Sequence, residues 1–290
     1  MNLRSDTIYR EYGTSLKVET ISQPIGLINC NELYPLVNSI FRDFEIDHLD
    51  SMEWEDPQIV IRKVKKGYER SSPWLQKPVV HNDPVDAVCD LTVDLIHAFV
   101  ADHPGYLCLH SAAALFKKGL ILFPSTYRSG KSTLALHLAI NGVPLFTDDA
   151  LPISGENDGL ATGLFPRIRL PLPHCVTHNF RNFIERRTVI GNDRYCYVSL
   201  DRTEQPPYGT QEQISAVILL KLDMQGNTQK VDHVQKKDAV KEIILRNFAR
   251  QNKAIDIVDR IYSIAEHADC YRLTYSDPNE AAKLLKDTFS

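Results

Sequence analysis

The chain has 290 residues, of which 43% are hydrophobic and 24% charged, and its formal net charge at pH 7 is −4. These values are typical of a globular protein and exclude extensive disorder. The negative charge also disfavours a nucleic-acid binder, because no broad basic field offsets phosphate repulsion. No apolar run approaches the roughly 18 residues of a membrane span, and the N-terminus lacks the apolar core of a signal peptide. We therefore expect a cytoplasmic protein without a membrane partner.

The first part of the chain has the pattern of a small α+β segment. Strand-like runs at residues 16–18 and 59–64 flank a helical stretch at residues 32–41. A polar stretch with several prolines at residues 71–84 has the composition of a linker or long loop. We therefore expect an accessory segment over residues 1–84 and a larger core over residues 85–290.

The core is predicted to begin with a helix and a hairpin. Apolar residues recur at helical spacing over residues 85–100, and Asp83 followed by Pro84 is a favoured helix start. Residues 106–116 are apolar and strand-like, and a Lys-Lys-Gly turn connects them to a second strand at residues 120–123. This pattern predicts an antiparallel hairpin that leads directly into the loop that follows.

That loop ends in the second half of a phosphate-binding motif. It lies between an apolar strand and an apolar helix predicted at residues 134–140, as a phosphate loop requires. In such a loop the lysine, here Lys131, reaches the β- and γ-phosphates, and the next hydroxyl, that of Ser132, holds Mg²⁺. The candidate residues of the motif are Ser129, Gly130, Lys131, Ser132 and Thr133.

The front of the loop departs from the general motif. Ser125 stands where the first glycine is expected, and the bulky residues Tyr127 and Arg128 lie inside the loop. The backbone amides of residues 127–131 would contact phosphates, and Arg128 adds a positive charge there or is a solvated surface arginine. The alternative is a helix N-terminus that contains these residues without binding phosphate.

A pair of carboxylates follows the next predicted strand, at residues 143–146. Asp148 and Asp149 occupy the place of a second magnesium-binding element. If the pleat of the strand continues, they point to opposite sides, so that one reaches the metal and the other takes a proton from an acceptor hydroxyl. A surface turn is the alternative. His110 becomes a candidate because the hairpin returns its neighbourhood towards the loop.

The remaining core elements are predicted to complete an α/β fold. Residues 214–222 form a continuous apolar run typical of a central buried strand. Helical periodicity extends over residues 238–266, and a further strand and a closing helix are expected at residues 271–275 and 279–287. The six cysteines are scattered without Cys-x-x-Cys spacing, which indicates reduced thiols rather than disulfides or a zinc site.

Taken in order and spacing, these motifs resemble the kinase core of HPr kinase/phosphorylase and its relatives. The resemblance covers about residues 105 to 290, and the hairpin before the loop is also similar to phosphoenolpyruvate carboxykinases. It implies a mixed-sheet α/β P-loop kinase core with a smaller α+β N-terminal segment. The motifs that carry it are His110-Ser111-Ala112-Ala113, Lys117-Lys118-Gly119, Gly130-Lys131-Ser132-Thr133, Asp148-Asp149, the segment at residues 165–170 and the pattern at residues 270–275.

The resemblance implies a kinase that uses ATP and Mg²⁺ to phosphorylate a serine-type hydroxyl. Lys131 would bind phosphates, while Ser132 and Asp148 would hold the metal. Asp149 or Asp148 would act as general base, and His110 would line the reaction centre. A further phosphate contact is implied for Arg167 or Arg169, with Arg169 taken as the nucleotide-binding candidate.

The acceptor and the catalytic competence stay open at the sequence level. The glycine-poor front of the loop and the lack of the downstream signature used to engage HPr leave a protein, a peptide or a small molecule as the acceptor. The N-terminal segment is a candidate acceptor surface, and the family also allows a homo-oligomer. The alternative is a non-catalytic nucleotide-binding regulator or scaffold. A GTPase-type switch would need an Asn-Lys-x-Asp-like element, which the sequence lacks.

Overall fold

A computed structural model describes residues 13–43, 45–49, 57–125, 129–173, 176–223, 226, 229–248 and 253–290. The chain forms two compact units. The first comprises Met1–Asn38 and Glu45–Leu95, and the second comprises Ser39–Phe44 and Ile96–Ser290. Helix α2 (Pro84–Asp102) runs through the point where the first unit ends. The sequence-based boundary between residues 84 and 85 stays a prediction.

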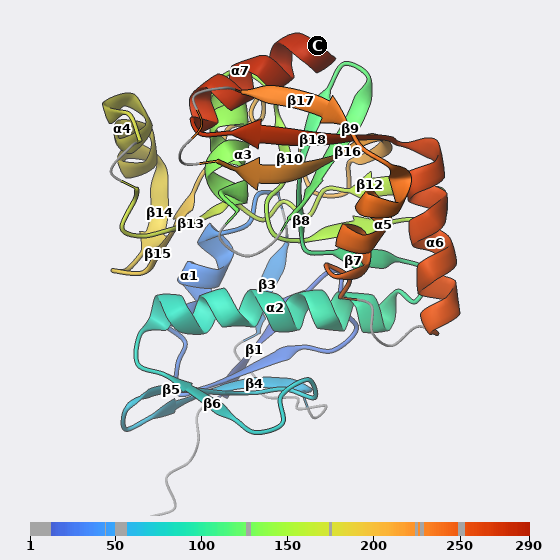
Figure 1. Ribbon diagram of the computed structural model, residues 1–290. Coiled ribbons are helices and arrows are strands. Elements are labelled where there is room, and N and C mark those ends of the chain that lie inside the picture. Colours follow the sequence, from blue (N-terminus) through green and yellow to red (C-terminus); the bar gives the residue numbers. More distant parts are fainter. Residues whose placement is uncertain are drawn as a thin grey trace, which may run out of the picture. The chain divides into compact units, whose positions relative to one another are not determined.

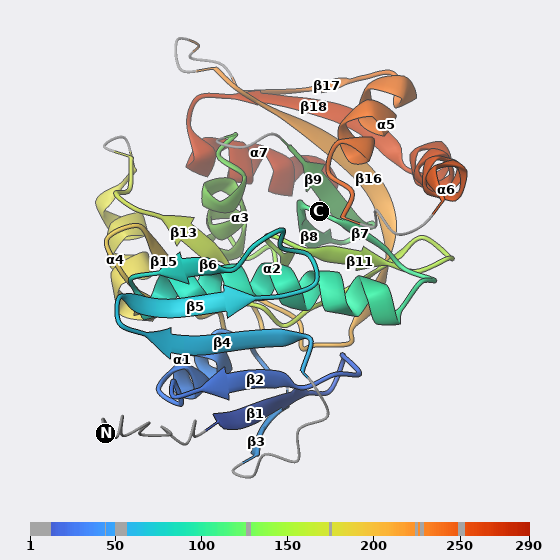
Figure 2. The same ribbon diagram turned by 90° about the horizontal axis from the view of Figure 1, so that it is seen from below.

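The first unit is built on a six-stranded sheet with the order β3-β1-β2-β4-β5-β6, and Figure 2 shows its strands side by side. Neighbouring strands are antiparallel except β2 and β4, which are parallel. The stretch expected to be a linker therefore contains an edge strand, β6. The elements are β1 (Gly13–Val18), β2 (Ile25–Ile28), α1 (Leu33–Ser39), β3 (Ile46–Leu49), β4 (Ile59–Val64), β5 (Gly67–Ser71) and β6 (Val79–His81).

The start of α2 is fixed by its predicted cap. The Asp83 carboxylate accepts hydrogen bonds from the backbone N–H groups of Val85 at 2.8 Å and Asp86 at 3.3 Å. Within the first unit, the buried side chains of Arg70 and Asp94 form an ion pair that joins β5 to this helix. Because each buried charge has a partner, the pair fixes the position of the helix on its sheet.

The second unit is built on a nine-stranded mixed sheet, counted over the described residues, and Figure 1 shows helices packed against it. Its centre is the long strand β16, which is parallel to β9 and to β18 and antiparallel to β12. The strands are β7 (Leu107–Leu109), β8 (Ser111–Phe116), β9 (Gly119–Pro124), β10 (Leu145–Thr147), β11 (Leu151–Ile153), β12 (Asp158–Leu160), β16 (Gln211–Leu222), β17 (Lys230–His233) and β18 (Asp269–Tyr275).

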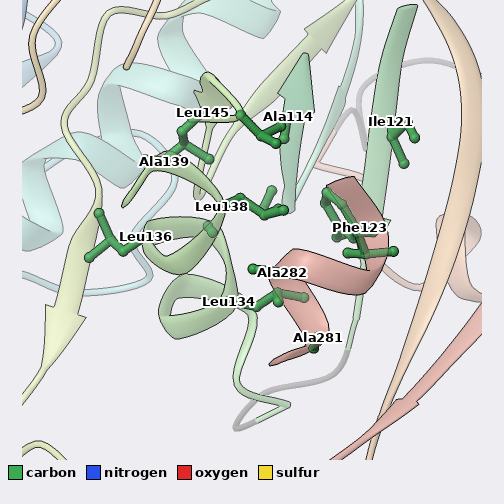
Figure 3. Close-up of a cluster of buried hydrophobic side chains, with 14 of the residues drawn as sticks. Ala114, Ile121, Phe123, Leu134, Leu136, Leu138, Ala139, Leu145, Ala281 and Ala282 are labelled. Carbon is green, nitrogen blue, oxygen red and sulfur yellow. The ribbon is translucent and has the colours of Figure 1, made fainter. Parts of the chain in front are cut away.

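Both faces of this sheet are buried, because successive side chains of a strand point to opposite faces. On β9, Ile121 and Phe123 join one apolar cluster, and Leu120 and Leu122 join another. The first cluster includes α3 (Lys131–Ile140) and α7 (Pro278–Phe289), and Figure 3 shows it around Leu138. The second includes α5 (Lys236–Ile244) and α6 (Ala254–His267). Helices therefore cover both faces.

A small three-stranded sheet with the order β13-β15-β14 completes the second unit. It consists of β13 (Arg167–Arg169), β14 (Thr188–Gly191) and β15 (Tyr195–Val198), and the chain between β13 and β14 contains α4 (His178–Arg187). Ile168 and Cys196 join the first apolar cluster, so one face of this small sheet is packed against the core.

The expected α/β class with a mixed sheet is confirmed, and so is the antiparallel hairpin, which is formed by β8 and β9. One difference is that residues 106–116 are not a single strand. The chain breaks at His110, so that β7 pairs with β11 while β8 pairs with β9 and β10. Over the described ranges, none of the helices has both the length and the apolar composition needed to cross a membrane.

Candidate active site

The loop between β9 and α3 is closed by a contact between its two ends. Ser125 and Ser129 are both buried, and the Ser129 hydroxyl donates a hydrogen bond of 2.8 Å to the Ser125 hydroxyl. The serine that replaces the first glycine of the general motif therefore holds the far end of the loop. Tyr127 and Arg128, predicted to bind phosphate, lie outside the described residues.

The last turn of the loop requires glycine at position 130. Gly130 has φ +82° and ψ 9°, a left-handed conformation that side chains disfavour, and it is the N-cap of α3. A Cβ atom there would also lie 2.6 Å from the Tyr275 hydroxyl. That hydroxyl donates a hydrogen bond of 2.9 Å to the backbone carbonyl of Ser129. A fully buried tyrosine at the end of β18 therefore fixes the start of α3.

Lys131, the first residue of α3, carries a buried ammonium group. The side chain is 8% exposed, and Nζ lies 3.6 Å from Asp149 Oδ1. Within the described part of the chain, Nζ has no hydrogen-bond acceptor. Because an ammonium has three N–H donors, burying it in this state is costly. The position therefore favours a ligand that supplies acceptor oxygens.

The two aspartates lie in a bend directly after β10. The Thr147 hydroxyl donates a hydrogen bond of 2.7 Å to the Ala150 carbonyl and so closes the bend around them. Since the strand ends at Thr147, the pleat does not continue, and both carboxylates interact with the Lys131 ammonium. Asp148 is buried, whereas the Asp149 side chain is 22% exposed. This difference separates an inner carboxylate from one that solvent reaches.

Asp149 is surrounded by nitrogen donors on both of its oxygens. Oδ1 lies 3.4 Å from His110 Nε2 and 3.6 Å from Lys131 Nζ, and Oδ2 lies 3.1 Å from Arg167 Nη2. Burial alone would raise the pKa of Asp149. The hydrogen bond from His110 and the charges of Lys131 and Arg167 outweigh burial and hold this pKa below its usual range. Asp149 is therefore a carboxylate at neutral pH.

Asp148 has the opposite electrostatic situation. Burial, and then the charge of Asp149, raise the pKa of Asp148 to about 6, although Lys131, the Ser132 hydroxyl and Arg167 lower it in part. Its Oδ2 accepts a hydrogen bond of 3.4 Å from the backbone N–H of Arg167. Its Oδ1 is buried and has no hydrogen-bond partner among the residues described. The inner carboxylate thus presents one unsatisfied oxygen beside Ser132.

His110 reaches the carboxylates because the chain breaks between β7 and β8. Its backbone N–H donates a hydrogen bond of 2.7 Å to the Arg246 carbonyl, and its ring lies 5.9 Å from the ring of Phe248. The imidazole is 38% exposed, so it faces solvent on one side and Asp149 on the other. This places His110 at the open side of the carboxylate pair.

The structure brings together most of the residues that the sequence indicated, namely Lys131, Asp148, Asp149, His110, Arg167 and, through Asp148, Ser132. Thr133 is half-buried in the first turn of α3. Arg169 is exposed on β13, and its guanidinium carbon lies 5.7 Å from the centre of the Tyr195 ring.

Two contributions were not found from the sequence. The sequence predicts Tyr275 only as part of a strand, because no local pattern indicates that its hydroxyl contacts a loop 146 positions earlier. No sequence motif includes Arg194 and Tyr195, although the centre of the Tyr195 ring lies 5.3 Å from the Arg167 guanidinium carbon and 5.5 Å from that of Arg194. A signal for them exists in the arginine-rich composition of residues 167–202, which contain seven arginines in a chain of net negative charge.

No family model matches the sequence, and no curated protein matches it. Among solved structures, the chain is similar to the Hpr(Ser) kinase/phosphatase from Coxiella burnetii, with a TM-score of 0.30 and 12% sequence identity. The match covers 62% of this chain and 95% of that one. A similarity of this size does not establish a family, so function has to be inferred from the residues of the site.

Proposed function

We propose that this protein is a phosphotransferase that binds ATP with Mg²⁺ at the loop before α3. It transfers the γ-phosphoryl group to a hydroxyl of an acceptor, which is a protein, a peptide or a small molecule. The nucleotide site consists of the loop that ends at Gly130, together with Lys131, Ser132 and Thr133 at the start of α3. The chemistry takes place at Asp148, Asp149 and His110.

One observation carries this proposal. Two buried polar atoms of opposite charge, Lys131 Nζ and Asp148 Oδ1, lack hydrogen-bond partners in the described part of the protein and belong to the same cluster. Buried polar groups are normally satisfied, and exceptions mark sites with a function. Phosphate oxygens would satisfy the ammonium, and a divalent cation would satisfy the carboxylate. A Mg-nucleotide supplies both at once.

The residues also fit Mg²⁺. The ion prefers oxygen ligands, and in phosphotransferases it commonly takes one or two from the protein and the others from water and phosphate. The Asp148 carboxylate and the Ser132 hydroxyl would hold it, since these two groups already interact. When bound, Mg²⁺ neutralises phosphate charge as it develops. Because a metal favours the ionised form of its ligand, the raised pKa of Asp148 would fall on binding.

Asp149 would accept the proton of the acceptor hydroxyl. The acceptor oxygen forms a bond to the γ-phosphorus, the bond from that phosphorus to the β,γ-bridging oxygen breaks, and ADP leaves with those electrons. Asp149 is a weak base while three nitrogen groups hold its charge. When Lys131 contacts phosphate instead, less positive charge acts on Asp149 and its basicity rises. Nucleotide binding therefore prepares the base.

His110 and Arg167 would position Asp149. They contact different oxygens of the carboxylate, at 3.4 Å and 3.1 Å, and so define its plane. The backbone N–H of Arg167 also contacts Asp148. A single residue of β13 thereby holds both carboxylates in register, which is the type of positioning that phosphoryl transfer depends on.

The test combines binding and turnover. Calorimetric titration with ATP should give binding that needs Mg²⁺, and ADP should form when acceptors with hydroxyl groups are added. Lys131→Ala and Asp148→Asn should each abolish binding, whereas Lys118→Ala, an exposed lysine of the hairpin turn, should not. Binding without turnover across a broad acceptor panel would support the regulator or scaffold instead. If neither ATP nor GTP binds in the presence of Mg²⁺, the proposal is wrong.

A further inference from the structure

A short part of the second unit comes from early in the chain. Between two stretches that belong to the first unit, the chain over Ser39–Phe44 is part of the second. We call its described residues, 39–43, the inserted segment. They contact residues 163–166, which lead into β13 and end directly before Arg167. Because Arg167 contacts both carboxylates of the candidate site, the inserted segment lies only a few residues of chain away from them.

The backbone of the inserted segment pairs with this leading chain. The Arg42 N–H donates a hydrogen bond of 2.7 Å to the Gly163 carbonyl, and the Phe165 N–H donates one of 2.8 Å to the Ile40 carbonyl. An isolated antiparallel β-bridge lies between these two bonds. The pairing is thus strand-like, and it fixes the path of the chain up to two residues before Arg167.

The close approach of the two backbones requires glycine at position 163. Gly163 has φ +66°, in the left-handed region that side chains disfavour. A Cβ atom there would lie 2.5 Å from the backbone oxygen of Arg42. Because this oxygen is part of the backbone, it cannot turn aside as the end of a flexible side chain would. A larger residue at position 163 would therefore separate the inserted segment from the leading chain.

The Arg42 side chain connects the two strands that pair in the small sheet. Its Nη2 donates a hydrogen bond to the carbonyl of Leu200, two residues after β15. Its guanidinium carbon lies 5.6 Å from the centre of the ring of Phe165, two residues before β13. A planar guanidinium can form directional hydrogen bonds and stack on a ring at the same time. Arg42 therefore fixes the end of the sheet at which β15 ends and β13 begins.

The leading chain is held on its other side as well. The fully buried Gln205 donates a hydrogen bond of 2.9 Å from Nε2 to the Leu164 carbonyl. The Val198 N–H donates one of 3.0 Å to the Pro166 carbonyl. Each residue from 163 to 166 thus has a backbone group in a hydrogen bond. A shift caused by losing the inserted segment would therefore pass along this fixed chain to Arg167.

We infer that Arg42 is a positioning residue of the proposed transfer centre. It acts through Arg167, whose Nη2 lies 3.1 Å from Asp149 Oδ2 and whose backbone N–H contacts Asp148. Phosphoryl transfer depends on such placement, since a displacement of about 1 Å caused far from the chemistry can lower the rate about a hundredfold. The inference rests on the proposed phosphotransferase function and adds to it a residue that no sequence motif contains.

The test compares the ground state with a mimic of the transition state, so that it needs no known acceptor. Calorimetry with Mg²⁺ and β,γ-imido-ATP measures ground-state binding to the full chain. Mg²⁺ with ADP and aluminium fluoride mimics the γ-phosphoryl group during transfer, with water in the place of the acceptor hydroxyl. We expect Arg42→Ala to weaken binding of the aluminium fluoride complex by about tenfold or more. Binding of β,γ-imido-ATP should change by less than about twofold, because Arg42 does not act on the phosphate loop.

Two further variants and a control separate positioning from a general loss of stability. In the Arg167→Gln background, Arg42→Ala should not weaken the aluminium fluoride complex further, because the residue through which it acts is gone. Arg42→Lys keeps a donor for the Leu200 carbonyl and should recover part of the affinity. Arg202→Ala is the matched control, since it removes an exposed ion pair with Asp43 of the same inserted segment and should leave both affinities unchanged. Circular dichroism checks that each variant is folded, and Arg42→Lys replaces Arg42→Ala in the comparison if the alanine variant is not.

Three results with these variants would overturn the inference. Arg42→Ala could bind the aluminium fluoride complex as tightly as the wild-type chain does, or its affinities for both complexes could fall together. In the third case, its effect adds in full to that of Arg167→Gln. The inference is also wrong if the wild-type chain binds β,γ-imido-ATP and does not bind the aluminium fluoride complex, although the nucleotide site then stands. Failure of the proposed function is distinguishable, because the wild-type chain would then bind neither complex, and the inference is rejected with it.

Discussion

Replacing Asp148 by asparagine should stabilise the free protein and abolish the Mg²⁺-dependent nucleotide binding that we propose. The carboxylate is buried, and its pKa is raised to about 6 from an ordinary value of 3.8. Because burial and the neighbouring Asp149 raise this pKa, the ionised form is disfavoured in the folded protein by an amount on the order of a few kcal/mol. Asparagine has the same shape without the charge. Since its amide still needs hydrogen-bond partners, we expect a net gain of about 1 to 2 kcal/mol at pH 7.

The gain should depend on pH in a defined direction. Because the folded protein has the higher pKa, it holds the Asp148 proton more tightly than the unfolded chain does, and stability falls as pH rises from about 4 to about 6. The full free-energy cost of burying the Asp148 charge is present above pH 6 and absent below pH 4. The stabilisation by Asp148→Asn should therefore be largest at neutral pH and vanish near pH 4.

Thermal unfolding followed by circular dichroism between pH 4 and pH 8 measures this effect. At pH 7 the midpoint should rise by a few degrees, while Asp259→Asn, at an exposed position on α6, should change it little. Adding Mg-ATP at about 100 times its Kd should stabilise the wild-type chain by roughly 2.7 kcal/mol and leave the variant unchanged. If Asp148→Asn instead lowers the stability, and lowers it equally at pH 7 and at pH 4, then Asp148 is not an uncompensated buried charge.

Four further outcomes are expected. Lys131→Met should reduce transfer by about a thousandfold or more in an ADP-release assay, because it removes the charge proposed to contact the phosphates; transfer at the wild-type rate would contradict this. Asp149→Asn should retain Mg-ATP binding in calorimetry and lose transfer, and equal loss of both would instead assign Asp149 to the metal. Tyr275→Phe should lower the free energy of unfolding by about 1 kcal/mol and weaken ATP binding severalfold, because the Ser129 carbonyl loses its hydrogen bond. Unchanged ATP binding would contradict this. Gly130→Ala should lower the free energy of unfolding by about 2 kcal/mol or more, because alanine disfavours φ +82° and its Cβ would clash with the Tyr275 hydroxyl. An unchanged midpoint in urea would refute this reasoning.

Local patterns predicted the start of α2 and the hairpin of the second unit, but not its strands β11, β12 and β17 or the small sheet with α4. The start of α2 depends on Asp83 and Pro84, which are adjacent in sequence and carry the capping information themselves. The hairpin depends on two apolar runs and a glycine turn, which are also local. Strand β6 was missed for the opposite reason, because a three-residue edge strand is defined by its pairing with β5 and has little pattern of its own.

The candidate site was predictable in its residues but not in its geometry. A motif indicates that Lys131 and Asp149 belong together, yet their distance is decided by the bend at Thr147. The break at His110 results from a backbone hydrogen bond with Arg246, more than a hundred positions away. The contact of Asp148 with a backbone N–H leaves no trace in the sequence, because every residue except proline has such a donor.

The bond between Tyr275 and Ser129 also concerns the order of events during synthesis. The two residues are 146 positions apart, so a ribosome has translated the loop before α3 long before it reaches the tyrosine that donates a hydrogen bond to it. A growing chain folds from its N-terminal side, and such distant contacts form last. A nascent chain that stops before β18 would therefore contain the loop before α3 without the hydrogen bond from Tyr275. If the chain binds nucleotide as we propose, it would do so only after β18 has been translated, and ATP would therefore not guide the early steps of folding.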